Sequence, residues 1–453
     1  LVMLPRIPQW WIAMLGLMRL GAVPIPATIQ LSSRDVTFRL RTAQVRGVVT
    51  NTDGAVKVLG FDGKQFSIGG AAAGWVDFDA ELKKASTDFQ DEKTRSTDPG
   101  ILYFTSATTG EPKMVQHTQA SYPLAHRLTG ELWLDGKPGD VIWNVSDLGW
   151  AKAAWSSLYG PWHVGACIFA LDIHGKFDPT HTLDTLANFP ITIWCVPPTA
   201  LRLLVRQDLS RWKFPHLRHC VTAGEPLNPE VFKLWKSATG LEIHEGYGQT
   251  ESIILIGYCR SLGDEVRPGS MGKPIPGMTI TLLDDEGREV PTGCEGEIAV
   301  RVKPEHPLGL FHEYWRNPEE TAAHFQGDWY LAGDKAIRDA DGYFWFVGRK
   351  DDVIKSSGYR IGPFEVESVL LEHPAVLEAA VVGKPDHERG QLVKAFVVLR
   401  AEATASEELI HELQHHCRQA AAPYKYPREI EFVKELPKTI SGKTRRAELR
   451  KKS

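Results

Sequence analysis

The sequence has few cysteines and none of the clusters in which cysteines usually act together. Six are spread over 453 residues, and no Cys-x-x-Cys pair occurs among them. Disulfide frameworks and zinc ribbons depend on such groupings, so neither is indicated. The simplest interpretation is a protein of a reducing, intracellular compartment.

Strong net charge and long apolar runs are also missing. The formal net charge is only -4, which gives no overall electrostatic reason to expect nucleic acid or an anionic membrane as a partner. The most apolar stretch, residues 10–23, is interrupted by Arg19 and is too short to span a bilayer. We expect no transmembrane segment, and we expect this stretch to form a buried helix that ends at Gly21.

An initiating methionine is absent, and the chain opens with the apolar run LVMLPR. Such a run is typical of the middle of a fold, so we expect the N-terminal part of the protein to be incomplete here. Any targeting peptide would then lie outside this sequence.

The chain is long enough for two or more domains. In residues 1–350, runs rich in Val, Ile and Leu alternate with helical patterns. This alternation predicts a large α/β domain of mixed sheets flanked by helices. Strands with Asp-Gly and Glu-Gly turns in its last part predict an antiparallel β subdomain. Residues 351–453 follow a helix, strand, strand, helix pattern and predict a small α+β domain, with the boundary at Asp351.

The stretch YFTSATTGEPKMV, residues 103–115, suggests phosphate binding. A short apolar strand leads into a loop of hydroxyls and a glycine, and Lys113 follows the loop. Backbone N–H groups, hydroxyls and an ammonium are donors that hold phosphate oxygens. The Walker pattern is absent, so a P-loop kinase or GTPase fits poorly. On this loop alone, an ordinary Ser/Thr turn remains the alternative.

Five further stretches accompany this loop: AGEP at 223–226, EGYGQTES at 245–252, YLAGD at 330–334, GRKDDVIKSSGYRIGPFEVE at 348–367 and LPKTISGKTRR at 436–446. In this order and at these separations they resemble the adenylate-forming superfamily of acyl-CoA synthetases, luciferases and peptide-synthetase adenylation domains. The wording QDLSRWKFPHLRHCVTAGE and APYKYPREIEFV is similar to the medium-chain acyl-CoA synthetases. The resemblance covers nearly the whole chain.

The resemblance implies the adenylate-forming fold, with a mobile C-terminal domain, and a two-step ligase. ATP, CoA and a medium-chain or aromatic carboxylate would give acyl-CoA, AMP and diphosphate through an acyl-adenylate, with Mg²⁺ as cofactor. It implies three catalytic residues, Thr250, Glu251 and Lys443. Glu251 and Thr108 would be the metal ligands. Lys443 would donate to both the carboxylate and the α-phosphate, which aligns the attack and neutralises developing charge.

The implied ATP-binding residues surround the phosphates, the adenine and the ribose. Asp334 would accept hydrogen bonds from both ribose hydroxyls, with help from Arg349. The full set is Thr105, Ser106, Ala107, Thr108, Thr109, Gly110, Glu111, Pro112, Lys113, Gly224, Glu225, Pro226, Glu245, Gly246, Tyr247, Gly248, Gln249, Thr250, Asp334, Arg349, Arg360 and Lys443.

The second half-reaction would use another set of residues. In this family the C-terminal domain swings about a hinge, which matches Asp351. The implied CoA-binding residues are Ser357, Gly358, Tyr359, Arg360 and Arg389. Trp150, Trp155 and Tyr247 are candidates for the acyl pocket, although such an aromatic stripe is also typical of a plain core.

Two features depart from a simple assignment. The phosphate loop has Ala107 where the family usually has glycine, which costs about 1 kcal/mol if that position needs a positive φ. The run HELQH at 411–415 matches a zincin pattern, but helical spacing places His411 and His415 opposite the apolar face, so a zinc site is disfavoured.

Two other functions stay open on the sequence. The acyl group could pass from the adenylate to a carrier-protein thiol, or the chain could be an inactive nucleotide- or acyl-binding homologue. The expected compartment is intracellular, namely the mitochondrial matrix in a eukaryote or the cytoplasm in a bacterium.

Overall fold

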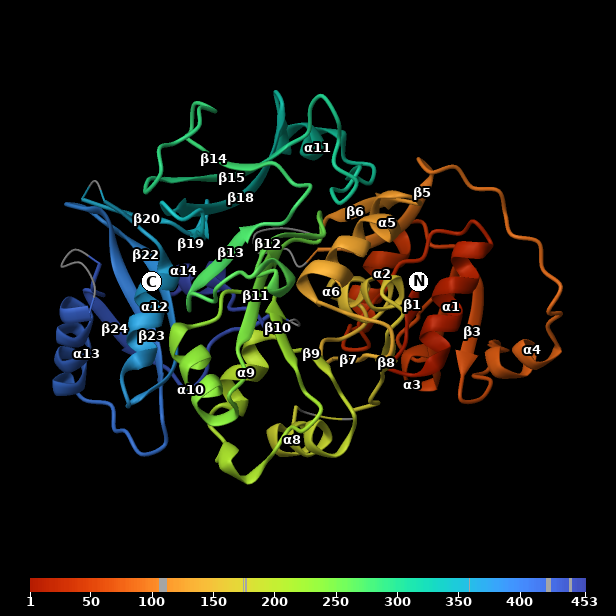
Figure 1. The fold of residues 1–453 in the computed structure, drawn as a ribbon, viewed down its shortest axis with the longest axis horizontal. Coiled ribbons are helices and arrows are strands. Elements are labelled where there is room, and N and C mark those ends of the chain that lie inside the picture. The colour runs from red at the N-terminus through yellow and green to blue at the C-terminus, as the bar shows by residue number, and fades with distance from the viewer. Residues whose placement is uncertain (106–111, 174, 176, 358, 421–424, 440–441) are drawn as a thin grey trace.

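The structure is a computed structural model that describes all residues except 106–111, 174, 176, 358, 421–424 and 440–441. Figure 1 shows the N-terminal elements at one end, a long sheet in the middle and the C-terminal elements at the other end. Helices and strands alternate along most of the chain. The predicted α/β multidomain class is therefore confirmed.

The N-terminal elements form a four-stranded parallel sheet in chain order. The first helix ends before Gly21, which has a positive φ of 69°, as predicted. Its burial differs from the prediction, because Trp10, Ala13 and Met14 are buried while Ile12 is 41% exposed. The elements are β1 (Val2–Met3), α1 (Pro8–Arg19), α2 (Ser33–Thr42), β2 (Gly47–Asn51), α3 (Thr52–Ala55), β3 (Lys64–Ile68), β4 (Val76–Asp77) and α4 (Phe78–Lys84).

A three-stranded antiparallel sheet flanks the predicted phosphate loop. Strand β5 (Pro99–Phe104) ends where the loop begins, and β6 (Met114–Thr118) follows Lys113. The register pairs Phe104 with Met114, so the two ends of the loop are held side by side. The third strand, β16 (Glu313–Tyr314), leads into α11 (Pro318–His324).

A twelve-stranded sheet fills the middle of the molecule. Strands β8, β7, β9, β10 and β11 pair in parallel, and the remaining strands continue antiparallel from β11. The predicted antiparallel subdomain therefore extends this sheet. The strands are β7 (Val141–Asn144), β8 (Cys167–Phe169), β9 (Ile193–Cys195), β10 (His219–Ala223), β11 (Ile243–Gly248), β12 (Ile254–Gly257), β13 (Ser270–Pro274), β14 (Ile280–Leu283), β15 (Glu295–Arg301), β17 (Phe325–Gln326), β18 (Trp329–Arg338) and β19 (Phe344–Arg349).

Helices and short helical turns precede or connect the strands of this sheet from β7 to β13, and most of them have buried residues. Trp194 of β9 and Trp235 of α10 pack with ring centroids 5.5 Å apart, and both are fully buried. The connections are α5 (Ser121–Leu128), η1 (Thr129–Trp133), α6 (Lys152–Ser156), α7 (Tyr159–His163), α8 (Pro179–Asn188), α9 (Pro198–Leu204), η2 (Leu209–Arg211), α10 (Pro229–Thr239) and η3 (Arg260–Leu262).

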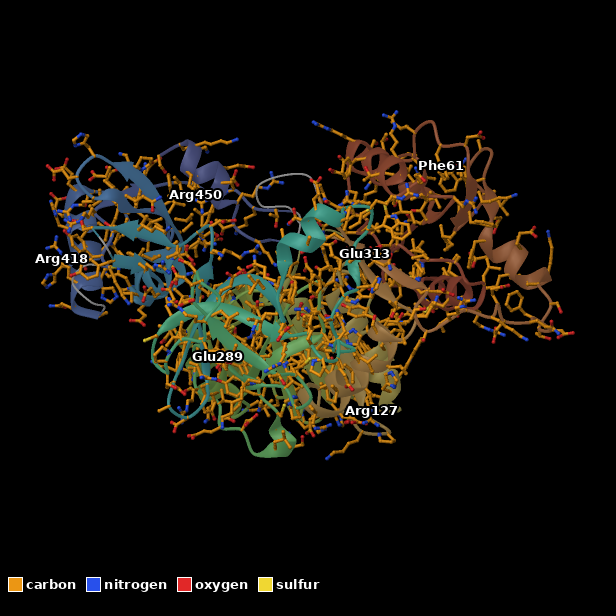
Figure 2. All side chains as sticks on the ribbon, turned by 90° about the horizontal axis from the view of Figure 1, so that it is seen from above. Phe61, Arg127, Glu289, Glu313, Arg418 and Arg450 are labelled. Carbon is orange, nitrogen blue, oxygen red and sulfur yellow. The ribbon has the colours of Figure 1, made fainter. Side chains whose placement is uncertain are left out.

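The C-terminal part has its own five-stranded sheet and its own core. Leu409, Leu413 and Cys417 of α13 are buried there, as the helical spacing predicts. The elements are β20 (Ile354–Ser356), β21 (Tyr359–Ile361), α12 (Pro363–Glu372), β22 (Val376–Asp386), β23 (Gly390–Leu399), α13 (Glu407–Ala420), β24 (Glu429–Phe432) and α14 (Arg446–Lys451). In Figure 2, Arg450 of α14 lies on the side that faces the rest of the chain, and Arg418 of α13 lies on the far side.

No helix among the described residues is both long enough and apolar enough to cross a bilayer. The expectation of no transmembrane segment holds for that part of the chain.

Two glycines test how tightly the long sheet is packed. Gly272 of β13 has a φ of 97°, and a Cβ there would lie 2.4 Å from the carbonyl of Gly257. Gly263 also has a positive φ, 76°, but a Cβ there would meet nothing within 4 Å. We expect Gly263→Ala to lower the free energy of unfolding by about 1–2 kcal/mol, the cost of the left-handed conformation alone. Gly272→Ala should lower it by clearly more, because β12 and β13 must also separate.

Urea unfolding of both variants and the parent would measure the difference. Equal losses for the two alanines would contradict the close approach of β12 and β13.

Candidate active site

One large cavity of about 790 Å³ lies where β11, the facing ends of β18 and β19, and the C-terminal part meet. Most of the predicted ATP-binding residues that the structure describes line it. They are Thr105, Lys113, Gly224, Glu225, Pro226, Glu245, Gly246, Tyr247, Gly248, Gln249, Thr250, Asp334, Arg349 and Lys443. The predicted metal ligand Glu251 also lines the cavity. Residues 106–111 of the predicted phosphate loop, including Ala107 and Thr108, lie outside the described residues. Pro112, at the end of that loop, does not line the cavity.

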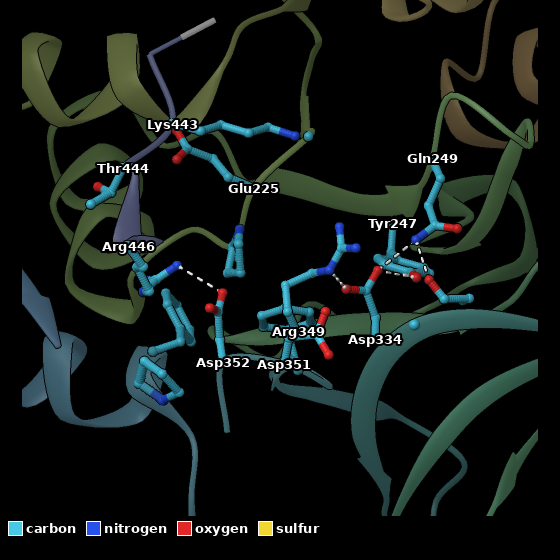
Figure 3. Close-up of a pocket in the computed structure, with 18 of the residues that line it drawn as sticks. Glu225, Tyr247, Gln249, Asp334, Arg349, Asp351, Asp352, Lys443, Thr444 and Arg446 are labelled. Atoms are coloured by element: carbon cyan, nitrogen blue, oxygen red, sulfur yellow. Dashed lines mark hydrogen bonds and ion pairs between the residues drawn. The ribbon is translucent and has the colours of Figure 1, made fainter. Parts of the chain in front are cut away.

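A buried carboxylate, Asp334, occupies one wall of the cavity. The register of β18 and β19 places it opposite Arg349, whose Nε lies 3.2 Å from Asp334 Oδ1. Tyr247 Oη and Gln249 Nε2 each donate to Asp334 Oδ2 at 2.7 Å (Figure 3). Burial raises the pKa of Asp334 above its ordinary value, and these three partners oppose the shift. The carboxylate is therefore held in one position, facing a space that a polar ligand can enter.

The loop after β10 forms a second wall. Gly224 has a φ of 106°, a conformation that glycine adopts without strain and that turns the chain into residues 225–228. Glu245 of β11 is buried beside this loop, and its Oε2 has no hydrogen-bond partner among the described residues. An unpaired buried oxygen is costly without a ligand. The position suits a ligand with polar edges, such as a purine.

The third wall carries Lys113 and Glu251, which meet through Tyr314. Tyr314 Oη donates to Glu251 Oε1 at 2.7 Å, and the Lys113 ammonium lies 5.1 Å from the centre of the Tyr314 ring. Lys113 also forms an ion pair with Glu320. The backbone of Thr250 is fixed by a hydrogen bond, because His117 Nε2 donates to its carbonyl at 2.8 Å. Burial lowers the pKa of His117 to about 3, so this histidine stays neutral.

Lys443 enters the cavity from the C-terminal part of the chain. Figure 3 shows its side chain beside Glu225, across the cavity from Asp334 and Arg349. The Lys443 side chain is exposed to the cavity rather than packed in a core. The surrounding protein lowers the pKa of its ammonium by desolvation, and Glu225 opposes this shift. The Lys443 cation thus lies across the cavity from a wall of carboxylates and donors.

Several residues of the cavity were not identified from the sequence. Arg202 of α9 forms an ion pair with Glu225 at 3.3 Å, and Arg446 donates to both oxygens of Glu367 at 2.8 Å. Tyr314 is a third. Arg446 follows Lys443 by three residues in a basic run, which was a usable signal. Arg202 and Tyr314 lie in segments with no polar motif, and only the fold brings them to the cavity.

The predicted CoA-binding residues lie away from the cavity. Arg360 pairs with Asp285 at 3.0 Å and with Glu295 at 3.6 Å, so it contacts β15 and the segment after β14. Arg389 Nη1 donates to Ser357 Oγ at 3.1 Å. Gly358 lies outside the described residues, and Tyr359 is 49% exposed. The predicted CoA-binding residues that the structure describes therefore lie outside the cavity, whereas Lys443 lies in it.

The two predicted acyl-pocket tryptophans do not line the cavity either. Trp155 is buried behind β11, where its Nε1 donates to Tyr122 Oη at 3.0 Å. A Cβ at Gly248 would lie 2.7 Å from the Trp155 ring, so this ring packs directly under the strand that carries Tyr247. Trp150 is half-buried.

The zincin pattern does not form a metal site. His411 and His415 are both exposed on α13. Within the described part of the chain, no group of three or more His, Cys, Asp or Glu side chains is placed to hold a metal ion.

Comparison with known families gives two matches along the chain. Residues 1–315 match the model of the AMP-binding enzymes, and residues 365–443 match the model of the AMP-binding enzyme C-terminal domain. The sequence is 48% identical over 461 residues to the mitochondrial acyl-coenzyme A synthetase ACSM3 of Mus musculus, covering 100% of this chain and 79% of that protein. It is 49% identical over 458 residues to the mitochondrial acyl-coenzyme A synthetase ACSM4 of Homo sapiens, covering 99% and 78%.

Solved structures agree with these matches. The anthranilate CoA ligase AuaEII in complex with anthranoyl-AMP superposes with a TM-score of 0.90 at 33% identity, covering 100% of this chain and 86% of that one. A benzoate CoA ligase from Burkholderia xenovorans LB400 superposes with a TM-score of 0.86 at 29% identity, covering 99% and 89%.

The Asp334 cluster yields a direct test by nucleotide binding. Tyr247→Phe keeps the ring and removes one donor to the carboxylate, so Asp334 is less well stabilised as an anion. We expect the affinity for AMP to fall about tenfold, as is typical of a lost hydrogen bond to a charged group. Tyr343→Phe is the matched control, because Tyr343 is buried but donates to the Glu265 carbonyl outside the cavity. Calorimetric titration with AMP would measure the affinity of each variant. Equal affinities for the two variants would contradict this role of Tyr247.

Proposed function

This chain belongs to the AMP-binding enzyme family, and from that premise we propose how its cavity makes an acyl-CoA. The reaction joins a carboxylate to CoA at the expense of ATP and releases AMP and diphosphate. The observation that carries the proposal is the position of Lys443. It reaches from the C-terminal part into the cavity that holds Asp334, Arg349 and Tyr247.

The first half-reaction is proposed to occur in the orientation seen here. A carboxylate oxygen of the acid attacks the α-phosphorus of ATP, the bond to the β-phosphate oxygen breaks, and diphosphate leaves. Asp334 would accept from the ribose hydroxyls, while Glu245 and the loop at 224–226 would contact the adenine. The Lys443 ammonium would lie near both reacting groups and neutralise the charge that develops between them.

Mg²⁺ is the proposed metal, and Glu251 is its proposed protein ligand together with Thr108. Mg²⁺ is commonly bound by one or two carboxylates together with substrate phosphates and water. Glu251 lines the cavity on the same wall as Lys113, and a carboxylate in that position fits this pattern. When bound, the ion would offset the negative charge of the phosphates.

The second half-reaction is proposed to need a different orientation of residues 351–453. The CoA thiolate attacks the carbonyl carbon of the acyl-adenylate, and AMP leaves. In this structure Lys443 lines the cavity, whereas Ser357, Tyr359, Arg360 and Arg389 do not. A rotation about Asp351 would move Lys443 out of the cavity and bring the predicted CoA-binding residues to it.

The proposed substrates are medium-chain fatty acids or aromatic acids. The names of the relatives support an acyl or aryl carboxylate. Both curated relatives are named as mitochondrial, which supports the mitochondrial matrix as the proposed compartment if the source is a eukaryote.

The role of Lys443 is tested by AMP release. The assay would measure carboxylate-dependent AMP formation from MgATP, with and without CoA, over acetate, butyrate, octanoate, palmitate and benzoate. We expect CoA-dependent release with octanoate or benzoate, and a loss of at least about 10²-fold in Lys443→Ala, because a charge-stabilising donor is removed. Lys434→Ala is the control, since Lys434 is an exposed lysine nearby in the chain that does not line the cavity. Turnover by Lys443→Ala at the parent's rate would remove this residue from the mechanism.

The hinge is tested by separating the half-reactions. Asp351→Pro fixes the backbone at the boundary, so we expect acyl-adenylate formation to persist and thioester formation to disappear. Pyrophosphate exchange reports the first step, and conversion of supplied acyl-adenylate with CoA reports the second. If both steps fell equally, Asp351 would not be a hinge.

A further inference from the structure

Asn228 occupies a helix-capping position but does not cap its helix. It precedes α10, where an asparagine side chain usually accepts from the second or third backbone N–H of the helix. No such bond is formed, although Asn228 has the extended backbone of a cap and is buried. Its amide is used elsewhere, which suggests another function for this side chain.

The Asn228 amide joins the large domain to the C-terminal domain. Its Oδ1 accepts from Arg202 Nε at 3.0 Å, and its Nδ2 donates to Ser368 Oγ of α12 at 3.1 Å. Arginine has hydrogen-bond donors and no acceptor, so Arg202 can bind the oxygen of the Asn228 amide but not its nitrogen. The Asn228 amide nitrogen must then point toward Ser368. Arg202 therefore fixes the orientation of the amide that makes the hydrogen bond between the domains.

On the large-domain side, Arg202 is bound to the proposed adenine loop. Its Nη2 donates to the Pro226 carbonyl at 3.0 Å, and its Nη1 pairs with Glu225 at 3.3 Å. The Arg202 guanidinium thus binds three oxygens of residues 225–228, one each from Glu225, Pro226 and Asn228. The loop and the amide of Asn228 are therefore positioned together.

On the C-terminal side, α12 leads to Lys443. Glu367, the neighbour of Ser368, accepts from Arg446 Nη2 through both carboxylate oxygens at 2.8 Å. It also accepts from the backbone N–H of Val381 at 2.8 Å, which fixes it to the sheet of that domain. Arg446 follows Lys443 by three residues, so holding α12 in place also holds the segment that carries Lys443.

We propose that Asn228 is a positioning residue of the first half-reaction: oriented by Arg202, it holds α12 through Ser368 and keeps Lys443 in the cavity. This inference rests on the proposed function. When residues 351–453 rotate, the bond from Asn228 to Ser368 breaks, so it contributes to the first half-reaction alone. Arg206, which donates to the Leu377 carbonyl at 2.7 Å, and Arg360, which pairs with Asp285, also join the domains. Loss of one contact therefore weakens this orientation by a moderate factor.

Ser368→Ala tests the contact with little risk to folding, because Ser368 is half-buried on a helix. We expect octanoate-dependent pyrophosphate exchange to fall about three- to tenfold in kcat, the effect of one hydrogen bond, with the KM for ATP unchanged. Conversion of supplied octanoyl-adenylate with CoA should keep the parent's rate. Ser368→Thr retains the hydroxyl and should restore exchange, and Ser237→Ala, on the exposed face of α10, is the matched control.

Exchange by Ser368→Ala at the parent's rate, or an equal fall in both half-reactions, would overturn the proposal. A second measurement does not need turnover: fluorescence energy transfer between labels at exposed Leu234 and His411 reports the orientation of the two domains. Ser368→Ala should shift that distribution relative to the parent and to Ser237→Ala, and an unchanged distribution would also overturn it. A parent without AMP release, but with a shifted distribution in Ser368→Ala, would contradict the proposed function and leave the contact supported.

Discussion

The site depends on the buried carboxylate of Asp334. A carboxylate taken out of water costs several kcal/mol unless charged and polar partners replace the lost hydration. Arg349, Tyr247 and Gln249 supply those partners, and they come from β19 and from β11 with the turn after it. The same bonds that make the burial tolerable also fix one wall of the cavity. The wall is therefore rigid before any ligand arrives.

The rest of the cavity is built by cations that are each committed to a carboxylate. Arg202 holds Glu225, Lys113 pairs with Glu320, and Arg446 holds Glu367. Lys443 differs from these three, because it forms no ion pair within the described part of the chain, and desolvation lowers the pKa of its ammonium. A cation placed near several carboxylates but packed against none is suited to a reacting anion. The arrangement separates the paired cations that organise the site from the lysine that is proposed to act in it.

Placing that cation on a separate domain has a consequence for the reaction. The proposed attack on the α-phosphorus is favoured where water is excluded and charges interact strongly. The proposed thioester step needs access for a thiol instead. A domain that rests on a few polar contacts, such as Asn228 to Ser368 and Arg360 to Asp285, can leave without disrupting either core. Such an interface suits the proposed two-step chemistry, in which the C-terminal domain changes its orientation between the steps.

The sequence by itself determined the fold class and the apolar strand that ends at Phe104, because these follow from local patterns. Its short motifs also identified a set of residues that the structure brings to the cavity, although they are a minority of the residues that line it. It did not determine the half-exposed face of α1, since apolar content says nothing about which face finds a partner. It also missed Arg202, Tyr314 and Asn228, whose partners are distant in the chain. Only the tertiary structure decided which domain orientation is present, with Lys443 in the cavity and Arg360 outside it. That choice depends on contacts between surfaces, and no local sequence pattern encodes them.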